Sequence, residues 1–382
     1  KLARLPALLD ALIEPRFLTP LAQDAAGARL ADLRERLRDA DGFEAKLNAA
    51  RRFQREEAFR ISVQLLEGLA HAGEAGAAHA ELAEACVTAM AQVALEEVER
   101  QHGAQPGAFA VFGLGKFGGR ELSDNADLDL MAVYDAPAES AGLAAPELYT
   151  RVTQRLISAL SAPTEEGALY EIDTKLRPSG SKGPVAVRLS SFERYYAEEA
   201  WTWEMQALTR LRPVAGDSAL GARVTAVANA ALARPRDRAK TLAEVADMRA
   251  LMDRERASKS MWDLKLAPGG FVDIEFIAQA LQLAHGSPMV QPNTGAALDH
   301  LAHAGALDRT RYARLTEAWR LWSDLQQTLR VCVGGNLAPD EAAAPLKAKI
   351  AALAGVESFE AAQAKISAMQ AAVRADFEAI VG

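Results

Sequence analysis

The stretch FGLGKFGGRELSDNADLDLMAVYD, residues 112–135, decides how this chain is interpreted. A glycine-rich turn follows one apolar run, and a second apolar run that contains Asp127 and Asp129 begins after it. Alternate side chains of a β-strand point to the same face, so both aspartates project from one face while Leu128 and Leu130 fill the other. Two carboxylates so close repel each other unless a cation lies between them. The pattern therefore predicts a cation site on this strand.

A third acid stands in another apolar run, where Asp173 lies within ALYEIDTKL, residues 168–176. Hard cations such as Mg²⁺ prefer oxygen ligands, and two-metal sites hold ions ~3.5–4 Å apart with shared carboxylates. The alternative is an edge strand whose acids are simply solvated. The recurrence of the same pattern in a second strand favours a metal site, with the ligands Asp127, Asp129 and Asp173.

Positive groups near these acids predict a triphosphate ligand. Lys116 lies in the glycine turn, where backbone N–H groups can face phosphate oxygens. Arg177 precedes PSGSKG, a second turn, and is the arginine expected to assist, whereas Arg210 and Arg212 are each more typical of salt bridges. The predicted nucleotide-binding residues are Gly115, Lys116, Gly118, Gly119 and Arg177.

The glycine turn admits two other interpretations. Gly113-x-Gly115-x-x-Gly118 is formally a dinucleotide fingerprint, and Asp135 stands near the place of its ribose-binding acid. However, only RELSDNA separates the last glycine from the next strand, which is too short for the crossover helix that joins parallel strands. A P-loop is excluded because Phe117 follows the lysine where Ser or Thr is required. We therefore expect ATP rather than NAD.

The remaining pattern predicts a mostly helical α+β protein with a small mixed sheet. Residues 1–107 and 219–382 show apolar residues at helical spacing, and a long amphipathic segment in the second region suggests a bundle. The expected domains are a helical arm (1–107), an α/β core (108–218) and a helical bundle (219–382). Within the core we expect strands at 109–114, 127–134, 168–176 and 183–189, a helix at 146–161, and helix from 191 to 212.

Composition narrows the function classes. Half of the 382 residues are apolar, a quarter are charged, and the net charge is −8, which argues against a nucleic-acid partner. No signal peptide is visible, and no uncharged apolar run reaches the roughly 18 residues of a membrane span. Only Cys86 and Cys332 are present, without metal-ligand spacing, so a reducing, cytoplasmic setting is expected. The chain starts at Lys1 without a methionine, which is compatible with a piece of a longer protein.

Two further patterns are not expected to form metal sites, and a structural or pocket-orienting role is favoured for the first. Asp273 and Glu275 form another acid-x-acid pair, but their surroundings have helical periodicity, and residues two apart on a helix point to different faces. His300 and His303 lack any other metal-ligand pattern nearby and are more typical of a helix surface.

Four segments in this order resemble glutamine-synthetase adenylyltransferase, within the nucleotidyltransferase superfamily related to DNA polymerase β. They are FAVFGLGKFGGREL with DLDL, EIDTKLRPSGSKGPV, YYAEEAWTWEMQALTRLR and DLKLAPGGFVDIEF. The resemblance covers most of the chain, and the EAWTWEMQAL segment resembles the half of that enzyme that attaches AMP. One departure is Ala126, where the family usually has serine just before the first metal aspartate.

The resemblance implies transfer of AMP from ATP to a tyrosine of glutamine synthetase, with release of pyrophosphate. It implies Asp127, Asp129 and Asp173 as catalytic residues that bind two Mg²⁺ ions, with Mn²⁺ as a substitute. It also implies a PII signalling protein as partner and glutamine as effector. The alternatives are the half that removes AMP by phosphorolysis, an enzyme of the same fold with another acceptor, and a non-catalytic nucleotide-binding regulatory module.

Overall fold

The computed structural model describes residues 15–21, 27–103, 107–137, 144–258, 260–286, 290–335, 337–339 and 341–382. The chain forms two compact units. Unit 1 comprises residues 1–200 and 210–228, and unit 2 comprises residues 201–209 and 229–382. The fold is mostly helical with a small mixed sheet, which confirms the predicted α+β class. The predicted boundaries after residues 107 and 218 stay a prediction.

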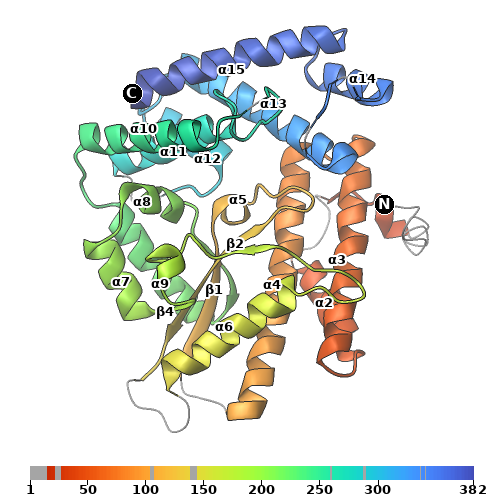
Figure 1. Ribbon diagram of the computed structural model, residues 1–382, viewed down its shortest axis with the longest axis vertical. Coiled ribbons are helices and arrows are strands. Elements are labelled where there is room, and N and C mark those ends of the chain that lie inside the picture. Colours follow the sequence, from red (N-terminus) through yellow and green to blue (C-terminus); the bar gives the residue numbers. More distant parts are fainter. Residues whose placement is uncertain are drawn as a thin grey trace. The chain divides into compact units, whose positions relative to one another are not determined.

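Three helices dominate the first hundred residues of unit 1. They are α2 (Ala28–Arg38), α3 (Phe43–Leu66) and α4 (Ala72–His102), preceded by the short η2 (Pro15–Leu18). Helix α4 begins with a capping box in which His71 and Glu74 bond each other's backbone N–H groups. Its buried face consists largely of alanine, and it packs against α2 and α3 (Figure 1). Small side chains allow this close packing, so the helical arm predicted from alanine-rich periodicity is confirmed from residue 28 onward.

The sheet of unit 1 has the strand order β3-β2-β1-β5, and β4 also pairs with β2. Strand β1 pairs with β2 and with β5 in antiparallel fashion, whereas β2 pairs with β3 and β4 in parallel. Between β1 and β2 lies only the single-turn helix α5 (Gly115–Gly118). An antiparallel β1–β2 pair excludes the parallel βαβ unit of a dinucleotide fold. The strands are β1 (Ala108–Gly113), β2 (Leu128–Asp135), β3 (Ile172–Asp173), β4 (Ala186–Arg188) and β5 (Arg212–Gly216).

Some predicted elements differ from the structure. The strand predicted at 168–176 shortens to two residues, and the one predicted at 183–189 to three. The helix expected from 191 to 212 is broken into α7 (Leu189–Glu198) and α8 (Thr202–Leu208). Strand β5 was not predicted. It contains Pro213 and lies at the sheet edge, where proline is tolerated. Helix α6 (Ala145–Ser161) lies as predicted and packs against α4.

Unit 2 is helical among its described residues. A buried apolar core that includes Ile274, Trp322, Leu325 and Ile366 joins its helices. Helix α9 (Ser218–Leu232) runs from unit 1 into unit 2. The other helices are α8, α10 (Arg238–Glu255), α11 (Phe271–His285), α12 (Thr294–His303), α13 (Arg309–Val333), α14 (Ala344–Leu353) and α15 (Phe359–Val381).

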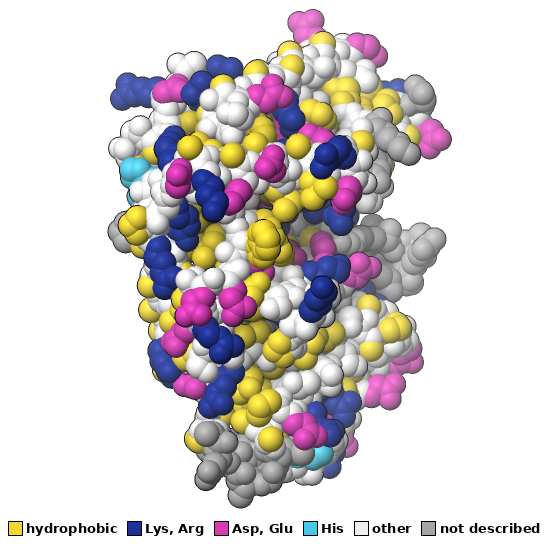
Figure 2. Space-filling model, turned by 60° about the vertical axis from the view of Figure 1, so that its left-hand side comes forward, with side chains coloured by type: hydrophobic (Ala, Val, Ile, Leu, Met, Phe, Trp, Pro, Cys, Tyr) yellow, Lys and Arg dark blue, Asp and Glu magenta, His cyan; other side chains and the backbone are white. Residues whose placement is uncertain are grey.

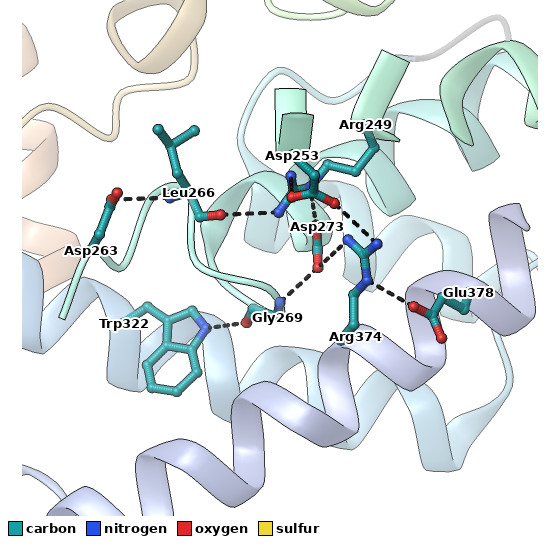
Figure 3. Close-up of polar contacts among 9 residues, drawn as sticks. All are labelled: Arg249, Asp253, Asp263, Leu266, Gly269, Asp273, Trp322, Arg374 and Glu378. Carbon is teal, nitrogen blue, oxygen red and sulfur yellow. Dashed lines mark hydrogen bonds and ion pairs between the residues drawn. The ribbon is translucent and has the colours of Figure 1, made fainter. Parts of the chain in front are cut away.

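The second acid-x-acid pair belongs to a buried ionic cluster in unit 2 (Figure 3). Asp273, in the first turn of α11, is fully buried and bonds Arg249 of α10 and the backbone N–H of Gly269 at 2.7 Å. Arg374 of α15 approaches the same carboxylate at 3.5 Å. The indole N–H of Trp322 donates to the Gly269 carbonyl at 3.2 Å. These contacts join four helices through the APGG loop, which is the structural role that the sequence favoured for Asp273.

The surface carries both signs of charge. On the face shown in Figure 2, Lys and Arg side chains are interspersed with Asp and Glu side chains. Among the described residues, none of the helices is both long and apolar enough to cross a membrane.

Candidate active site

The sheet brings two of the three predicted catalytic acids together. Strand β2 pairs with β3 so that Asp129 lies directly beside Asp173, and neighbouring strands are about 4.8 Å apart. Asp127, one residue before β2, lies on the same face by alternation. Asp127 is exposed and Asp129 half-buried, whereas Leu128 and Leu130 are buried, so the alternation predicted from sequence is confirmed.

The glycine turn is shaped around the carboxylate of Asp129. Gly115 has a positive φ of 52°, and a Cβ placed on it would lie 2.1 Å from Oδ2 of Asp129. The backbone N–H of Leu114 donates to the Asp129 carbonyl at 3.0 Å. A side chain at position 115 would therefore require the Asp129 carboxylate or the turn to move. This packing reason for the glycine was not visible in the sequence.

Two arginines at and before the start of β5 brace the turn from its carbonyl side. Arg210 donates to the Gly115 carbonyl at 3.2 Å and to the carboxylate of Glu121 at 3.0 Å. Arg212 donates to the carbonyls of Phe117 and Gly118, each at 3.1 Å. Arg212 also forms an ion pair with Glu84. Both arginines are therefore held in ion pairs and turn contacts, as the sequence favoured.

Gly118 and Gly119 have defined structural partners. A Cβ on Gly118 would lie 1.9 Å from the Arg210 carbonyl, so only glycine fits there. The backbone N–H groups of Gly118 and Gly119 donate within the turn, to Leu114 at 2.8 Å and Gly115 at 3.1 Å. The contact of Gly118 and Gly119 with phosphate therefore stays a prediction. For Gly118 the structure also shows that close packing against the Arg210 carbonyl requires glycine. Lys116 is half-buried in the same turn.

The carboxylate of Asp173 is held by Lys175. The ammonium Nζ lies 2.8 Å from Oδ2, and the backbone N–H of Lys175 donates to Oδ1 at 2.7 Å. Burial alone would raise the pKa of Asp173, but these hydrogen bonds and the charges of Lys175 and Arg177 hold that pKa below its usual range. The acid is therefore ionised at neutral pH. Sequence reasoning did not identify Lys175, although its position two residues after the acid was available.

Arg177 organises the loop that follows β3. It is buried, and it donates to the carbonyl of Thr174 at 2.6 Å, of Gly183 at 2.9 Å and of Pro184 at 3.0 Å. Burial lowers the pKa of its guanidinium, against the opposing charge of Asp173. These contacts show a positioning role in the loop, while direct contact with phosphate stays a prediction.

The predicted metal ligands fit a hard cation in type and strand position. Asp129 and Asp173 lie on adjacent strands and Asp127 lies just before β2, and oxygen donors suit Mg²⁺ or Mn²⁺. Their side chains are not yet gathered as ligands: among the described residues, no group of three or more His, Cys, Asp or Glu lies close enough to hold a metal ion. Both oxygens of Asp173 accept hydrogen bonds from Lys175. The assignment of Asp127, Asp129 and Asp173 as metal ligands stays a prediction.

A glycine turn between antiparallel strands, with acids on adjacent strands beside it, is the arrangement expected of a nucleotidyltransferase core. The chain belongs to the glutamate-ammonia ligase adenylyltransferase family, whose sequence model matches residues 1–227. Residues 238–379 match a second family, GlnD PII-uridylyltransferase. The resemblance recognised in the sequence is thereby confirmed.

Several curated proteins are similar along the whole chain. A protein of Caulobacter vibrioides is 46% identical over 389 residues, one of Xanthobacter autotrophicus 39% over 391, and one of Mesorhizobium japonicum 38% over 390. Each is described as a bifunctional glutamine synthetase adenylyltransferase/adenylyl-removing enzyme. The matches cover 100% of this chain but only 38%, 39% and 39% of those three proteins. The chain thus corresponds to a single half of each.

Proposed function

We propose that this chain transfers AMP from ATP to a tyrosine hydroxyl of glutamine synthetase and releases pyrophosphate. The observation that carries the proposal is the pairing of Asp129 with Asp173 beside the Gly115 turn. Family membership supports an adenylyltransferase, and the names of its relatives support glutamine synthetase as the acceptor.

The chain's own residues would hold and orient the reactants. Asp127, Asp129 and Asp173 would hold Mg²⁺, which when bound supplies charge neutralisation at the α-phosphate and the leaving pyrophosphate. Lys116 would contribute a positive charge to the triphosphate from the turn. Asp173 is also the acid expected to help remove the proton of the incoming hydroxyl.

The direction of the reaction is the finer part of the proposal. Attachment and phosphorolytic removal share the same acids and differ in the nucleophile admitted, a tyrosine hydroxyl or inorganic phosphate. We assign this chain to attachment because EAWTWEMQAL, residues 199–208, resembles the attaching half. Trp201 in this segment is 71% exposed, which suits contact with a large partner. The adenylyl-removing half remains the second candidate, because the relatives' names contain both activities.

We further propose that unit 2 receives regulatory signals. Its residues 238–379 match the PII-uridylyltransferase family, which supports a PII signalling protein as partner. Glutamine would act as an effector, and the setting would be cytoplasmic, as expected from the composition.

Asp129→Asn tests the catalytic assignment. The change keeps the side-chain shape and removes the charge, so we expect AMP transfer to fall by about 100- to 1,000-fold with little effect on folding. Asp135→Asn is the matched control, because Asp135 lies on the same face of β2 at its other end and pairs with Arg223 at 2.7 Å. The control should retain transfer. Equal transfer by Asp129→Asn and wild type would contradict the assignment.

The same experiment addresses the remaining alternatives. A non-catalytic regulatory module would show no Asp129-dependent transfer to any acceptor. An enzyme with a different acceptor would label another molecule and leave glutamine synthetase unmodified, which mass spectrometry of candidate acceptors with ATP and Mg²⁺ would detect.

A further inference from the structure

Lys175 engages both oxygens of a predicted catalytic carboxylate. Its Nζ lies 2.8 Å from Oδ2 of Asp173, and its backbone N–H donates to Oδ1 at 2.7 Å. The side chain of Lys175 is 72% exposed, whereas that of Asp173 is 27% exposed. The ammonium group therefore reaches the acid from the solvent side and has room to move away.

The ion pair also serves an electrostatic need of the site. Asp173 lies beside Asp129 in the β2–β3 register, and two adjacent carboxylates repel each other. An ammonium group at 2.8 Å compensates one of these charges before any metal arrives. A divalent cation on Asp173 would need the same oxygens, and it would repel the ammonium at that distance. Binding of a divalent cation to Asp173 is therefore weakened while Lys175 remains on the same carboxylate.

Lys175 differs in this respect from its neighbour Arg177. Arg177 is buried, and its guanidinium donates hydrogen bonds to the carbonyls of its own loop. Movement of this side chain would therefore break the contacts that hold the loop. Lys175 lies two residues after β3, and its side chain is largely exposed. The loop thus carries one fixed cation that shapes it and one exposed cation on the catalytic acid.

We propose that Lys175 is an internal counter-ion that competes with the divalent metal for Asp173 and is released when metal and nucleotide bind together. This inference rests on the proposed function. The phosphates of the nucleotide supply the negative charge that the released ammonium group requires. Metal alone must displace the ammonium without this compensation. The affinity for metal is therefore coupled to nucleotide, and by linkage the affinity for nucleotide is coupled to metal.

The test measures binding of Mn²⁺ alone to the full chain by electron paramagnetic resonance. Lys175→Met removes the competitor, and an exposed ion pair is worth roughly a two- to fivefold change in binding constant. We expect Mn²⁺ to bind the variant about two- to fivefold more tightly than wild type. Lys182→Met is the control, because Lys182 is an exposed lysine of the same loop and its removal changes the net charge equally. It should leave Mn²⁺ affinity close to wild type.

A second arm repeats the titration with a non-hydrolysable ATP analogue. We expect the advantage of Lys175→Met to vanish or reverse, because the released ammonium now contacts phosphate in wild type. Equal Mn²⁺ affinity of Lys175→Met and wild type, with affinity still lost in Asp129→Asn, would overturn this inference and leave the proposed function standing. An equal gain in Lys182→Met would show a general charge effect and also overturn it. Absence of Mn²⁺ binding in every protein and both arms would overturn both proposals.

Discussion

Gly115→Ala tests whether the glycine turn and the carboxylate of Asp129 are built as one site. The added Cβ would start 2.1 Å from Oδ2 of Asp129, a separation that real Cβ atoms do not show. To restore an ordinary separation of at least 3.4 Å, the carboxylate or the turn must move by about 1.3 Å. Misplacement of a reacting group by ~1 Å can cost about 100-fold in rate. We expect AMP transfer to fall by about that factor.

The backbone makes a separate and smaller contribution. Gly115 has a positive φ of 52°, where alanine is disfavoured by about 1–2 kcal/mol. For a unit of this size that corresponds to a fall of about 2–8 °C in melting temperature. Gly68→Ala is the matched control, because Gly68 has φ of 75° and no atom within 4 Å of the added Cβ. It carries a similar backbone cost without the collision.

The two variants should therefore differ in the rate of AMP transfer but have similar thermal stability. Thermal unfolding followed by circular dichroism should show comparable melting temperatures, within a few degrees. Labelled ATP and glutamine synthetase should show near-wild-type transfer in Gly68→Ala and a loss of about 100-fold in Gly115→Ala. Full transfer by a folded Gly115→Ala protein would refute the link between the turn and Asp129.

Three further predictions concern stability and reactivity. Arg249→Met removes one partner of the fully buried Arg249–Asp273 pair and should lower the free energy of unfolding of unit 2 by about 3–5 kcal/mol, measured by urea unfolding. Arg374→Met, at the edge of the same ionic cluster, should lower it by less. An equal loss in both variants would contradict the structural role given to the buried pair. Arg177→Met should make the loop after β3 sensitive to limited proteolysis, and unchanged cleavage would show that its carbonyl contacts are dispensable. Burial raises the pKa of the Cys86 thiol to about 12. A thiol reagent at pH 8 should therefore modify the exposed Cys332 in the native chain and Cys86 only after unfolding. Rapid modification of both cysteines in the native chain would contradict the burial of Cys86.

Much of the fold followed from local pattern. The amphipathic spacing of α6 and the alternation of β2 depend on residues a few positions apart, which is why both were predicted almost to their ends. Strand β5 depends instead on pairing with β1, about a hundred residues earlier, and on an edge position that tolerates Pro213. Neither condition is visible in the sequence around Arg212.

The candidate site shows the same division. The acids and the glycine turn were recognisable because charged residues in apolar strands and glycines in a turn are locally unusual. The reason why each position requires glycine was not predictable from the sequence. A side chain at position 118 would collide with the Arg210 carbonyl, and one at position 115 would collide with the Asp129 carboxylate. Lys175 was missed because an exposed lysine in a loop is ordinary until the geometry places it on Asp173.

The central claim is that this chain uses its paired strand acids to attach AMP to a protein. The most direct measurement incubates the chain with ATP labelled at the α-phosphate, Mg²⁺ and unmodified glutamine synthetase, with Asp129→Asn in parallel. The account predicts label covalently attached to a tyrosine of the synthetase by the wild-type chain and almost none by the variant. Absence of label, together with fast phosphate-dependent release of ADP from adenylylated synthetase, would contradict it and identify the chain as the removing half.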